Sequence, residues 1–343
     1  DRERNCWQWN LEEIKGRNIT DNVVELMAGK IQKLSAETQE VLKIAACIGN
    51  DFELETLAIV CQKTAKEVAV LLRSPVAEGL LLLLGDNYKL IELEVTPDSR
   101  TGILPVPKSK MPVNYKFAHD RIQQAAYSLI DETQKQAIHL QIGRLLLANL
   151  SEAESEEIIF DIVNHINKGI SLITDDKELD KVIQLNFIAG QKAKAGTAYN
   201  SAVKYFNFAL ENLRKNSWDT NYDFTIGLYL ETLEAEYLNL NYEVVEQLAN
   251  IILEKANTIF YKVRVYAIKI LFYSAQNQMQ NAINAGLEIL QMLGVSLIET
   301  PPETNLKIEE LYDLPVMTDA KKEAAMRILM MLFGPIYTTN PQK

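Results

Sequence analysis

The residues best placed to do chemistry lie between positions 114 and 130, in the run NYKFAHDRIQQAAYSLI. Residues 114–117 alternate polar and apolar side chains like a short strand, whereas apolar residues recur at helical spacing from 122 to 129. The period changes at His119, which is followed by Asp120. A histidine at a helix start can donate to a phosphate oxygen, because free backbone amides and the helix dipole favour anions there. This junction is therefore a candidate phosphate contact.

Two neighbours of the histidine have expected roles of their own. Asp120 is expected to be the N-cap of the helix, with Gln123 completing a capping box three residues later. Arg121 is a candidate for bracing a bound phosphate, with a surface salt bridge as the alternative. For His119 the alternative is packing between strand and helix, and one histidine near a helix start does not decide between the two.

The elements that position this junction precede it in the chain. Short helices are expected first and a pair of strands after them, at residues 35–48, 51–62, 64–79 and 80–94. Asp51 is the expected N-cap of the second helix, and Thr64 with Glu67 forms a capping box for the third. Three helices, two strands and a closing helix predict a winged-helix domain with a small β wing over residues 35–131. Residues 1–34 are expected to connect it to a preceding domain.

A DNA-reading role is disfavoured for this winged helix. Its third helix offers only Lys66 and Arg73 against Glu67 and Glu78, and the whole chain has a formal net charge of −11. A protein that grips the phosphate backbone needs clustered cations to displace counterions. We therefore expect no nucleic-acid partner.

The remainder, residues 132–343, is nearly all helical in period. Small-large-small triplets recur at a period of roughly 40 residues, at Ala202-Phe206-Ala209, Val245-Ala249-Ile252 and Ala282-Gly286-Ile289. They resemble tetratricopeptide repeats, and Gly190 falls where that repeat places a small residue in its first helix. The predicted fold is thus mainly α, with the winged helix followed by an α-α superhelix of tetratricopeptide-like repeats whose concave surface suits a protein or peptide ligand.

Composition describes an ordinary globular protein. The 343 residues are 48% hydrophobic and 24% charged. The three cysteines form no metal-ligand spacing, and the longest apolar runs are far too short for a membrane span. We expect a cytoplasmic location without membrane contact. The sequence lacks an initial Met and ends directly after a helical pattern, so we also expect a piece of a longer protein.

Catalytic motifs are missing from the sequence. It contains no GxxxxGK[ST], GxGxxG, HExxH or GxSxG motif and no protein-kinase HRD or DFG signature. His139 and His165 lie within helical runs, without a second metal-type residue at suitable spacing, and are expected to be packed or surface residues. No catalytic residue and no metal ligand is expected in this chain.

Several long runs resemble one family. They are residues 19–62, ITDNVVELMAGKIQKLSAETQEVLKIAACIGNDFELETLAIVCQ, then NYKFAHDRIQQAAYSLI, HLQIGRLLL and IFDIVNHINKG. These runs resemble the region after the ATPase core in the multi-sensor signal-transduction multikinases typical of cyanobacteria. Such proteins join a serine/threonine kinase, a STAND-type ATPase, a winged helix, helical repeats, a GAF sensor and usually a histidine kinase. The resemblance implies that this chain is the winged helix and repeats, without the phosphate loop, the kinases or the GAF domain.

The resemblance also implies a role for the junction. In related signalling ATPases a winged-helix histidine contacts the β-phosphate of bound ADP, and His119 in FAHD matches that position, although Ala118 replaces the methionine of the Met-His-Asp motif. ATP or ADP would then be bound only together with the ATPase core. The implied mechanism is a population switch in which nucleotide state sets kinase output. Two alternatives are a winged-helix transcription regulator and a pure helical-repeat scaffold.

Overall fold

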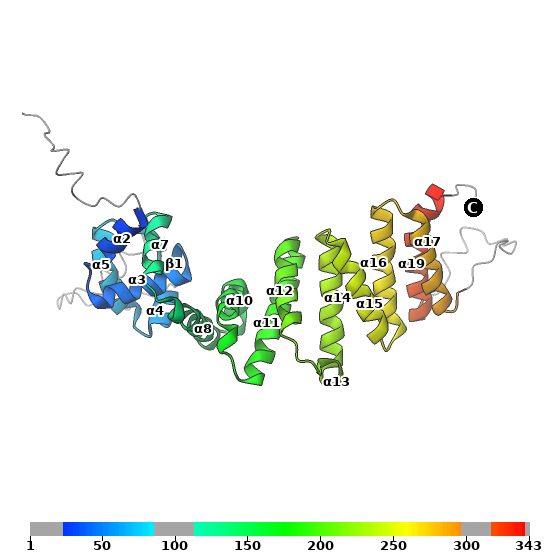
Figure 1. Cartoon of the computed structure of the whole chain (residues 1–343), viewed down its shortest axis with the longest axis horizontal. Helices are drawn as coiled ribbons and strands as arrows, with labels where there is room; N and C mark the ends of the chain where they lie inside the picture. The colour runs from blue at the N-terminus through cyan, green and yellow to red at the C-terminus, as the bar shows by residue number, and fades with distance from the viewer. Residues whose placement is uncertain (1–22, 86–112, 296–316, 340–343) are drawn as a thin grey trace, which may run out of the picture. The chain divides into compact units, whose positions relative to one another are not determined.

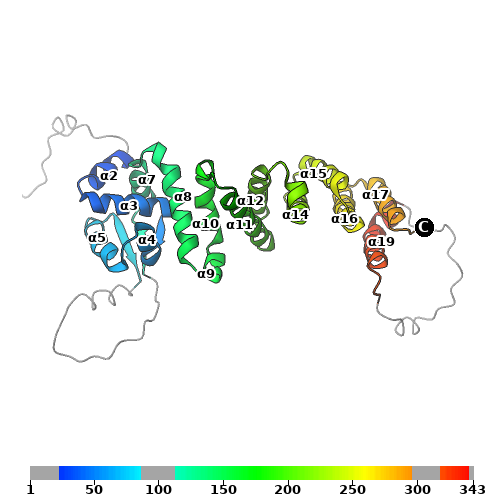
Figure 2. The same ribbon diagram turned by 90° about the horizontal axis from the view of Figure 1, so that it is seen from below.

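The chain forms two compact units, Asp1–Asp175 and Asp176–Lys343. The structure is a computed structural model that describes residues 23–85, 113–295 and 317–339. The fold is mainly helical with one small sheet, and Figures 1 and 2 show the helices of each unit. The sequence predicts that the winged-helix domain ends at residue 131 and the helical repeats begin at residue 132. The compact units divide later, and the domain limits stay a prediction.

Short helices and three strands build the first unit. They are α2 (Val23–Ile31), α3 (Ala36–Ile48), β1 (Asp51–Glu53), α4 (Leu54–Cys61), α5 (Ala65–Ala77), β2 (Leu81–Leu84), β3 (Asn114–Phe117), α7 (Asp120–Ser128), α8 (Glu132–Asn149), α9 (Glu152–Glu157), α10 (Ile159–Lys168) and the 3-10 helix η1 (Ile170–Leu172). The Ser35 side chain accepts from the Thr38 amide at the start of α3. Thr64 and Glu67 form the predicted capping box at the start of α5.

The three strands form an antiparallel sheet in the order β1-β3-β2. Phe52 lies opposite Tyr115, and their rings stack with centroids 5.9 Å apart. The expected helix at 51–62 is therefore wrong in its first turn, because residues 51–53 pair with β3 and α4 begins at Leu54. Asp51 is a strand residue whose carboxylate lies 3.3 Å from the Lys116 ammonium.

The first strand of the pair predicted at 80–94 is present as β2, Leu81–Leu84. The rest of that pair, residues 88–94, lies outside the described residues, as does the proline-rich segment that follows it. The start of the expected connector, with Trp7 and Trp9, is outside them too. Its helix α2 packs on α7 and buries Ile31 in the same core as Leu42, Leu72 and Phe117. The described part of the connector thus shares the core of the first unit.

The second unit is a succession of helix pairs. Its helices are α11 (Asp176–Ala195), α12 (Tyr199–Glu211), α13 (Ser217–Thr220), α14 (Tyr222–Leu238), α15 (Tyr242–Lys255), α16 (Ile259–Ala275), α17 (Met279–Met292) and α19 (Ala320–Thr339). α11 packs on α12, α14 on α15 and α16 on α17, and each pair also contacts the next. In Figure 1 these pairs follow one another in chain order from green to orange.

The recurring triplets lie where the pairs pack. All nine of their residues are buried. Gly190 of α11 faces Phe206 of α12 so closely that an added Cβ would lie 2.4 Å from its ring. Gly286 of α17 faces Leu332 of α19 in the same way, at 2.5 Å. A periodic pattern of small and large residues therefore marks the helix contacts correctly.

Candidate functional site

The junction singled out in the sequence lies at the exposed start of α7. The expectation for its cap is wrong: His119 is the N-cap and Asp120 is the first helical residue. The Nδ1 atom of His119 accepts from the backbone amide of Arg121 at 3.1 Å. Gln123 does not complete a capping box, because its side-chain amide donates to the Ala46 carbonyl at the end of α3, 3.1 Å away. That hydrogen bond links α7 to α3, and the side-chain cap of α7 is the imidazole of His119.

The capping bond fixes what the imidazole can do. Since Nδ1 of His119 accepts, a neutral ring carries its hydrogen on Nε2, where it can donate to an outside acceptor. Asp120 and Arg121 are also exposed. Arg121 donates to the side chain of Gln124 at 2.9 Å, so the salt bridge considered for it is not the contact that it makes here. The three predicted residues thus share one exposed helix start.

A second polar cluster in the first unit was missed by sequence reasoning. His139 of α8 and His165 of α10 lie with their Nδ1 atoms 2.9 Å apart, and the hydroxyl of Tyr127 in α7 is 3.1 Å from Nε2 of His139. The two imidazoles are only 2% and 6% exposed. Sequence reasoning treated these histidines as separate residues, and their separation of 26 positions gives no periodic signal. We call these three residues the His-His-Tyr chain.

Burial keeps both imidazoles of the His-His-Tyr chain neutral. It lowers the pKa of His139 to about 4, together with the nearby cations Lys168 and Lys135. Burial likewise lowers the pKa of His165 to about 4, together with His139 and Lys168. The neighbouring thiol of Cys47 has its pKa raised to about 11 by burial, so it is neutral as well. At neutral pH the cluster is held by hydrogen bonds without net charge.

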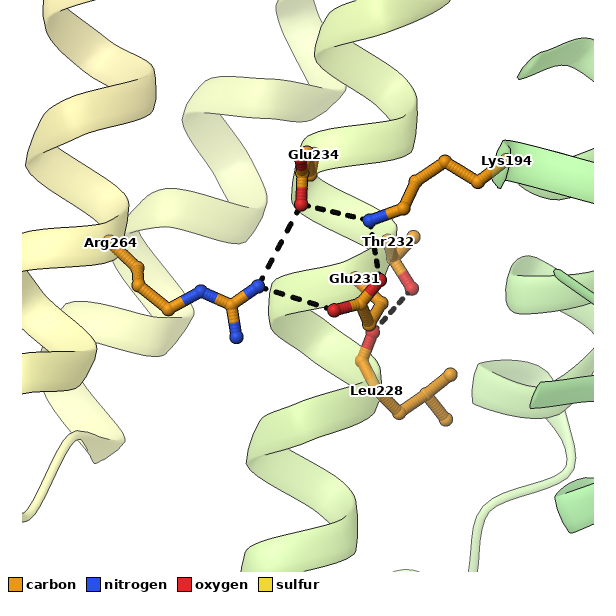
Figure 3. Close-up of polar contacts among 6 residues, drawn as sticks. All are labelled: Lys194, Leu228, Glu231, Thr232, Glu234 and Arg264. Carbon is orange, nitrogen blue, oxygen red and sulfur yellow. Dashed lines mark hydrogen bonds and ion pairs between the residues drawn. The ribbon is translucent and has the colours of Figure 1, made fainter. Parts of the chain in front are cut away.

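The second unit presents a charged network on the first helices of its pairs, which we call the charge quartet (Figure 3). The ammonium of Lys194 in α11 lies 2.5 Å from Glu231 and 2.9 Å from Glu234, both on α14. From the other side, the guanidinium of Arg264 in α16 lies 3.2 Å from Glu231 and 3.7 Å from Glu234. The quartet therefore links three successive helix pairs.

The quartet is half exposed. The side chains of Lys194 and Glu231 are 18% and 16% exposed, whereas those of Glu234 and Arg264 are 40% and 46% exposed. Burial alone would lower the pKa of Lys194, but the hydrogen bonds and charges of the two glutamates raise it overall. The ammonium thus stays charged at neutral pH. Separations of 33 to 40 residues, about one repeat, are the sequence signal that could have revealed this network.

Open space and apolar groups surround the quartet. Gly227 lies one turn before Glu231 in α14, and an added Cβ there would meet no atom within 4 Å. On α16, Phe260 and Leu271 flank Arg264 and are each 43% exposed. A mid-helix glycine lowers helix stability by about 1 kcal/mol relative to alanine. At Gly227 this small cost is accompanied by open space that another molecule could occupy. We call α11, α14 and α16 on this side the first-helix face.

Neither a metal site nor a membrane span is found in the described parts of the chain. Within residues 23–85, 113–295 and 317–339, no group of three or more His, Cys, Asp or Glu side chains could hold a metal ion. In the same ranges no helix has both the length and the apolar character required to cross a bilayer.

Comparison with known proteins relates the chain to signalling kinases. It is 29% identical over 341 residues to hybrid signal transduction histidine kinase G of Dictyostelium discoideum, in an alignment that covers 89% of this chain and 10% of the kinase. It is 22% identical over 282 residues to the peroxide stress-activated histidine kinase mak3 of Schizosaccharomyces pombe, covering 79% of this chain and 11% of that protein. The chain therefore spans about a tenth of the length of these relatives. No protein-family model matches it.

A solved structure also aligns with much of the chain. It is a signal-transduction ATPase with numerous domains and a tetratricopeptide-repeat sensor, from Pyrococcus horikoshii. The identity is 14%, the alignment covers 93% of this chain and 47% of that one, and the TM-score is 0.30. That score lies below the level of chains that share a fold.

Proposed function

We propose that this chain is a non-catalytic regulatory and protein-interaction segment of a larger cytoplasmic signalling histidine kinase. The observation that carries the proposal is the match of 89% of the chain to a tenth of a hybrid histidine kinase. A segment that small within a large kinase leaves room for separate catalytic domains. The helical make-up of the segment and its pairwise stacking suit binding better than chemistry.

The first-helix face is the part that we assign to binding a protein or peptide. It combines charged donors and acceptors in the quartet, apolar side chains at Phe260 and Leu271, and open space at Gly227. The carboxylates and cations of the quartet neutralise each other, so the face can accept a ligand without a large net charge. Apolar contacts with a few placed polar groups are typical of such binding surfaces.

We assign the sheet and helices of the first unit to a winged helix that senses nucleotide state. The order α3, β1, α4, α5, β2, β3, followed by α7, supports this assignment. The residues at the start of α7 suit a phosphate in part. His119 is exposed and, when neutral, has a donor at Nε2, whereas the carboxylate of Asp120 would repel an anion. The intramolecular partners would be the ATPase and kinase domains, and ATP or ADP would be bound only with that ATPase core.

The binding role is tested by filling the open space on the first-helix face. In the longer kinase, Gly227→Gln should change autophosphorylation, because the new side chain starts from a Cβ with no atom of this chain within 4 Å and extends into the space proposed for the ligand. Gly334→Gln is the matched control, since Gly334 is also a mid-helix glycine with open space around it. Equal autophosphorylation in both variants and in the wild type would refute the binding role.

The nucleotide role is tested by separating the cap from the donor at His119. His119→Asn keeps a good N-cap but removes the Nε2 donor, whereas His119→Ala removes both. If the imidazole contacts a phosphate, both variants of the longer protein should retain less ADP after purification than the wild type. Loss in the alanine variant alone would show that the histidine only caps the helix. The same result would favour a pure scaffold.

A further inference from the structure

The His-His-Tyr chain crosses three helices of the first unit. Tyr127 belongs to α7, His139 to α8 and His165 to α10, and the two contacts between them measure 3.1 Å and 2.9 Å. The imidazole rings lie with their centroids 5.0 Å apart. Near them a side chain at Gly143 of α8 would lie 2.4 Å from Ile166 of α10, so the two helices are in close contact. The polar chain is thus enclosed in a tight helix interface.

The hydrogens of the His-His-Tyr chain can be arranged in two ways. Two neutral imidazoles that face each other through Nδ1 can share only one hydrogen there. If His139 donates it, its Nε2 accepts from the hydroxyl of Tyr127. If His165 donates it, Nε2 of His139 donates to the Tyr127 oxygen instead. Both contacts therefore form in either arrangement while the two rings are neutral.

Protons change these contacts in two steps. With one added proton, one imidazolium still donates through Nδ1 to the other ring, so the bond between the histidines survives. With a second proton both Nδ1 atoms carry hydrogens, and two donors face each other 2.9 Å apart. Both charges would also lie in a buried place, where an unpaired charge is strongly unfavourable. Double protonation is therefore incompatible with the observed packing of α8 and α10.

The surroundings oppose protonation further. Lys135 on α8 and Lys168 on α10 act as positive charges on the imidazoles. From α3, the thiol of Cys47 acts on Tyr127, as does the carboxylate of Glu132 on α8. On α4, which also packs against α8, the titratable side chains are those of Glu55 and Cys61.

Carboxylates are also present near α10: Asp161 lies one turn before His165 and has its pKa raised by burial, and Glu156 and Glu157 belong to α9, which packs against α10. No carboxylate is among the groups that shift the pKa of either histidine in the part of the chain that the structure describes. The low pKa values of both rings agree with this arrangement.

We propose that the His-His-Tyr chain is an acid-sensitive lock, which holds α10 against α8 while the imidazoles are neutral and releases it when both are protonated. α10 and η1 are the last elements of the first unit before the second begins at Asp176. Release of α10 would thus free the last long helix of the first unit. This inference is independent of the nucleotide and binding roles proposed above.

Hydrogen exchange of the full chain at pH 7 and pH 5 tests the lock. After correction for intrinsic exchange rates, amides of α10 should open more often at pH 5, by roughly twentyfold for each histidine that must be protonated. His165→Asn removes one titrating ring and keeps an oxygen near the position of Nδ1, so the increase should fall by about that factor. Tyr127→Phe keeps both rings and should retain the full increase.

Two outcomes would overturn the lock. One is an equal increase of α10 exchange in the wild type and in His165→Asn. The other is an increase that spreads evenly over α3, α4 and α5, because global acid unfolding would then explain it without a local release. The amides of α5 serve as an internal reference for folding in each variant. If His165→Asn fails to protect α5 at pH 7, His165→Gln takes its place with the same expectation.

Discussion

The two polar clusters of this protein differ in burial and in charge. The His-His-Tyr chain of the first unit is buried and neutral, and hydrogen bonds join its members. The charge quartet of the second unit is half exposed and keeps four charges, which satisfy one another through ion pairs. Burial decides the difference, because a charge is tolerated near water and avoided inside. The first cluster therefore belongs to the interior of a helix interface, and the second can meet other molecules.

The clusters should also respond to different conditions. Protons should act on the buried chain, because its imidazoles must charge when the protein unfolds or takes up acid. Salt should act on the quartet, because exposed ion pairs are screened by counterions. In both units these responses can be measured together by pulsed hydrogen exchange along a urea titration, which reports each helix separately.

Acidification should have the largest effect, and we expect it to act through the first cluster. Both imidazoles have a lower pKa in the folded than in the unfolded chain, so the unfolded state takes up protons first. The free energy of unfolding should therefore fall as the pH drops from about 6.5 toward 4, by roughly 2 kcal/mol per histidine at pH 5. His165→Asn should remove about half of this dependence. An unchanged pH dependence in that variant would place the acid sensitivity elsewhere.

Breaking the quartet should have the next largest effect. Glu231 is its most buried carboxylate and contacts both cations, so Glu231→Gln should lower the stability of the second unit by about 1–2 kcal/mol. In 1 M NaCl this difference should shrink, because the ion pairs are then screened. Glu323→Gln is a matched control, since Glu323 pairs with Arg327 at an exposed site on α19. Equal losses of stability in the two variants would mean that the quartet stabilises the second unit no more than an ordinary surface ion pair does.

Removing one hydroxyl should have a smaller effect. Tyr127→Phe deletes the contact to His139 and keeps the ring, so it should lower the stability of the first unit by about 1 kcal/mol at pH 7. The slope of stability against pH should remain, because both imidazoles are still present. A loss of that slope would show that the hydroxyl itself controls protonation.

Local signals in the sequence were enough for much of this fold. Ser35 and the Thr64–Glu67 box mark helix starts because capping depends on neighbours within one turn. The triplets mark buried positions because repeat packing is periodic. By contrast, β1 was predicted as helix, since its three residues become a strand only by pairing with a segment more than sixty positions away.

The candidate sites were predictable to different degrees. His119, Asp120 and Arg121 were placed correctly at one helix start, but the cap was assigned to the wrong residue. An aspartate is a preferred N-cap, but the helix begins at Asp120, and it is His119 that has the extended backbone of a cap residue. The His-His-Tyr chain could not be predicted, because it depends on how α8 and α10 pack. The quartet was in principle predictable from separations of about one repeat.

The most direct test of the regulatory role is autophosphorylation by the longer kinase after removal of residues 23–339. The isolated catalytic domain serves as the reference for intact chemistry. We expect the shortened kinase to keep its catalytic activity, because no catalytic residue is assigned to this chain. We also expect its autophosphorylation rate to differ from that of the intact protein by about fivefold or more, as a regulatory coupling would produce. Equal rates in the shortened and intact proteins would contradict the proposal that this segment regulates the kinase.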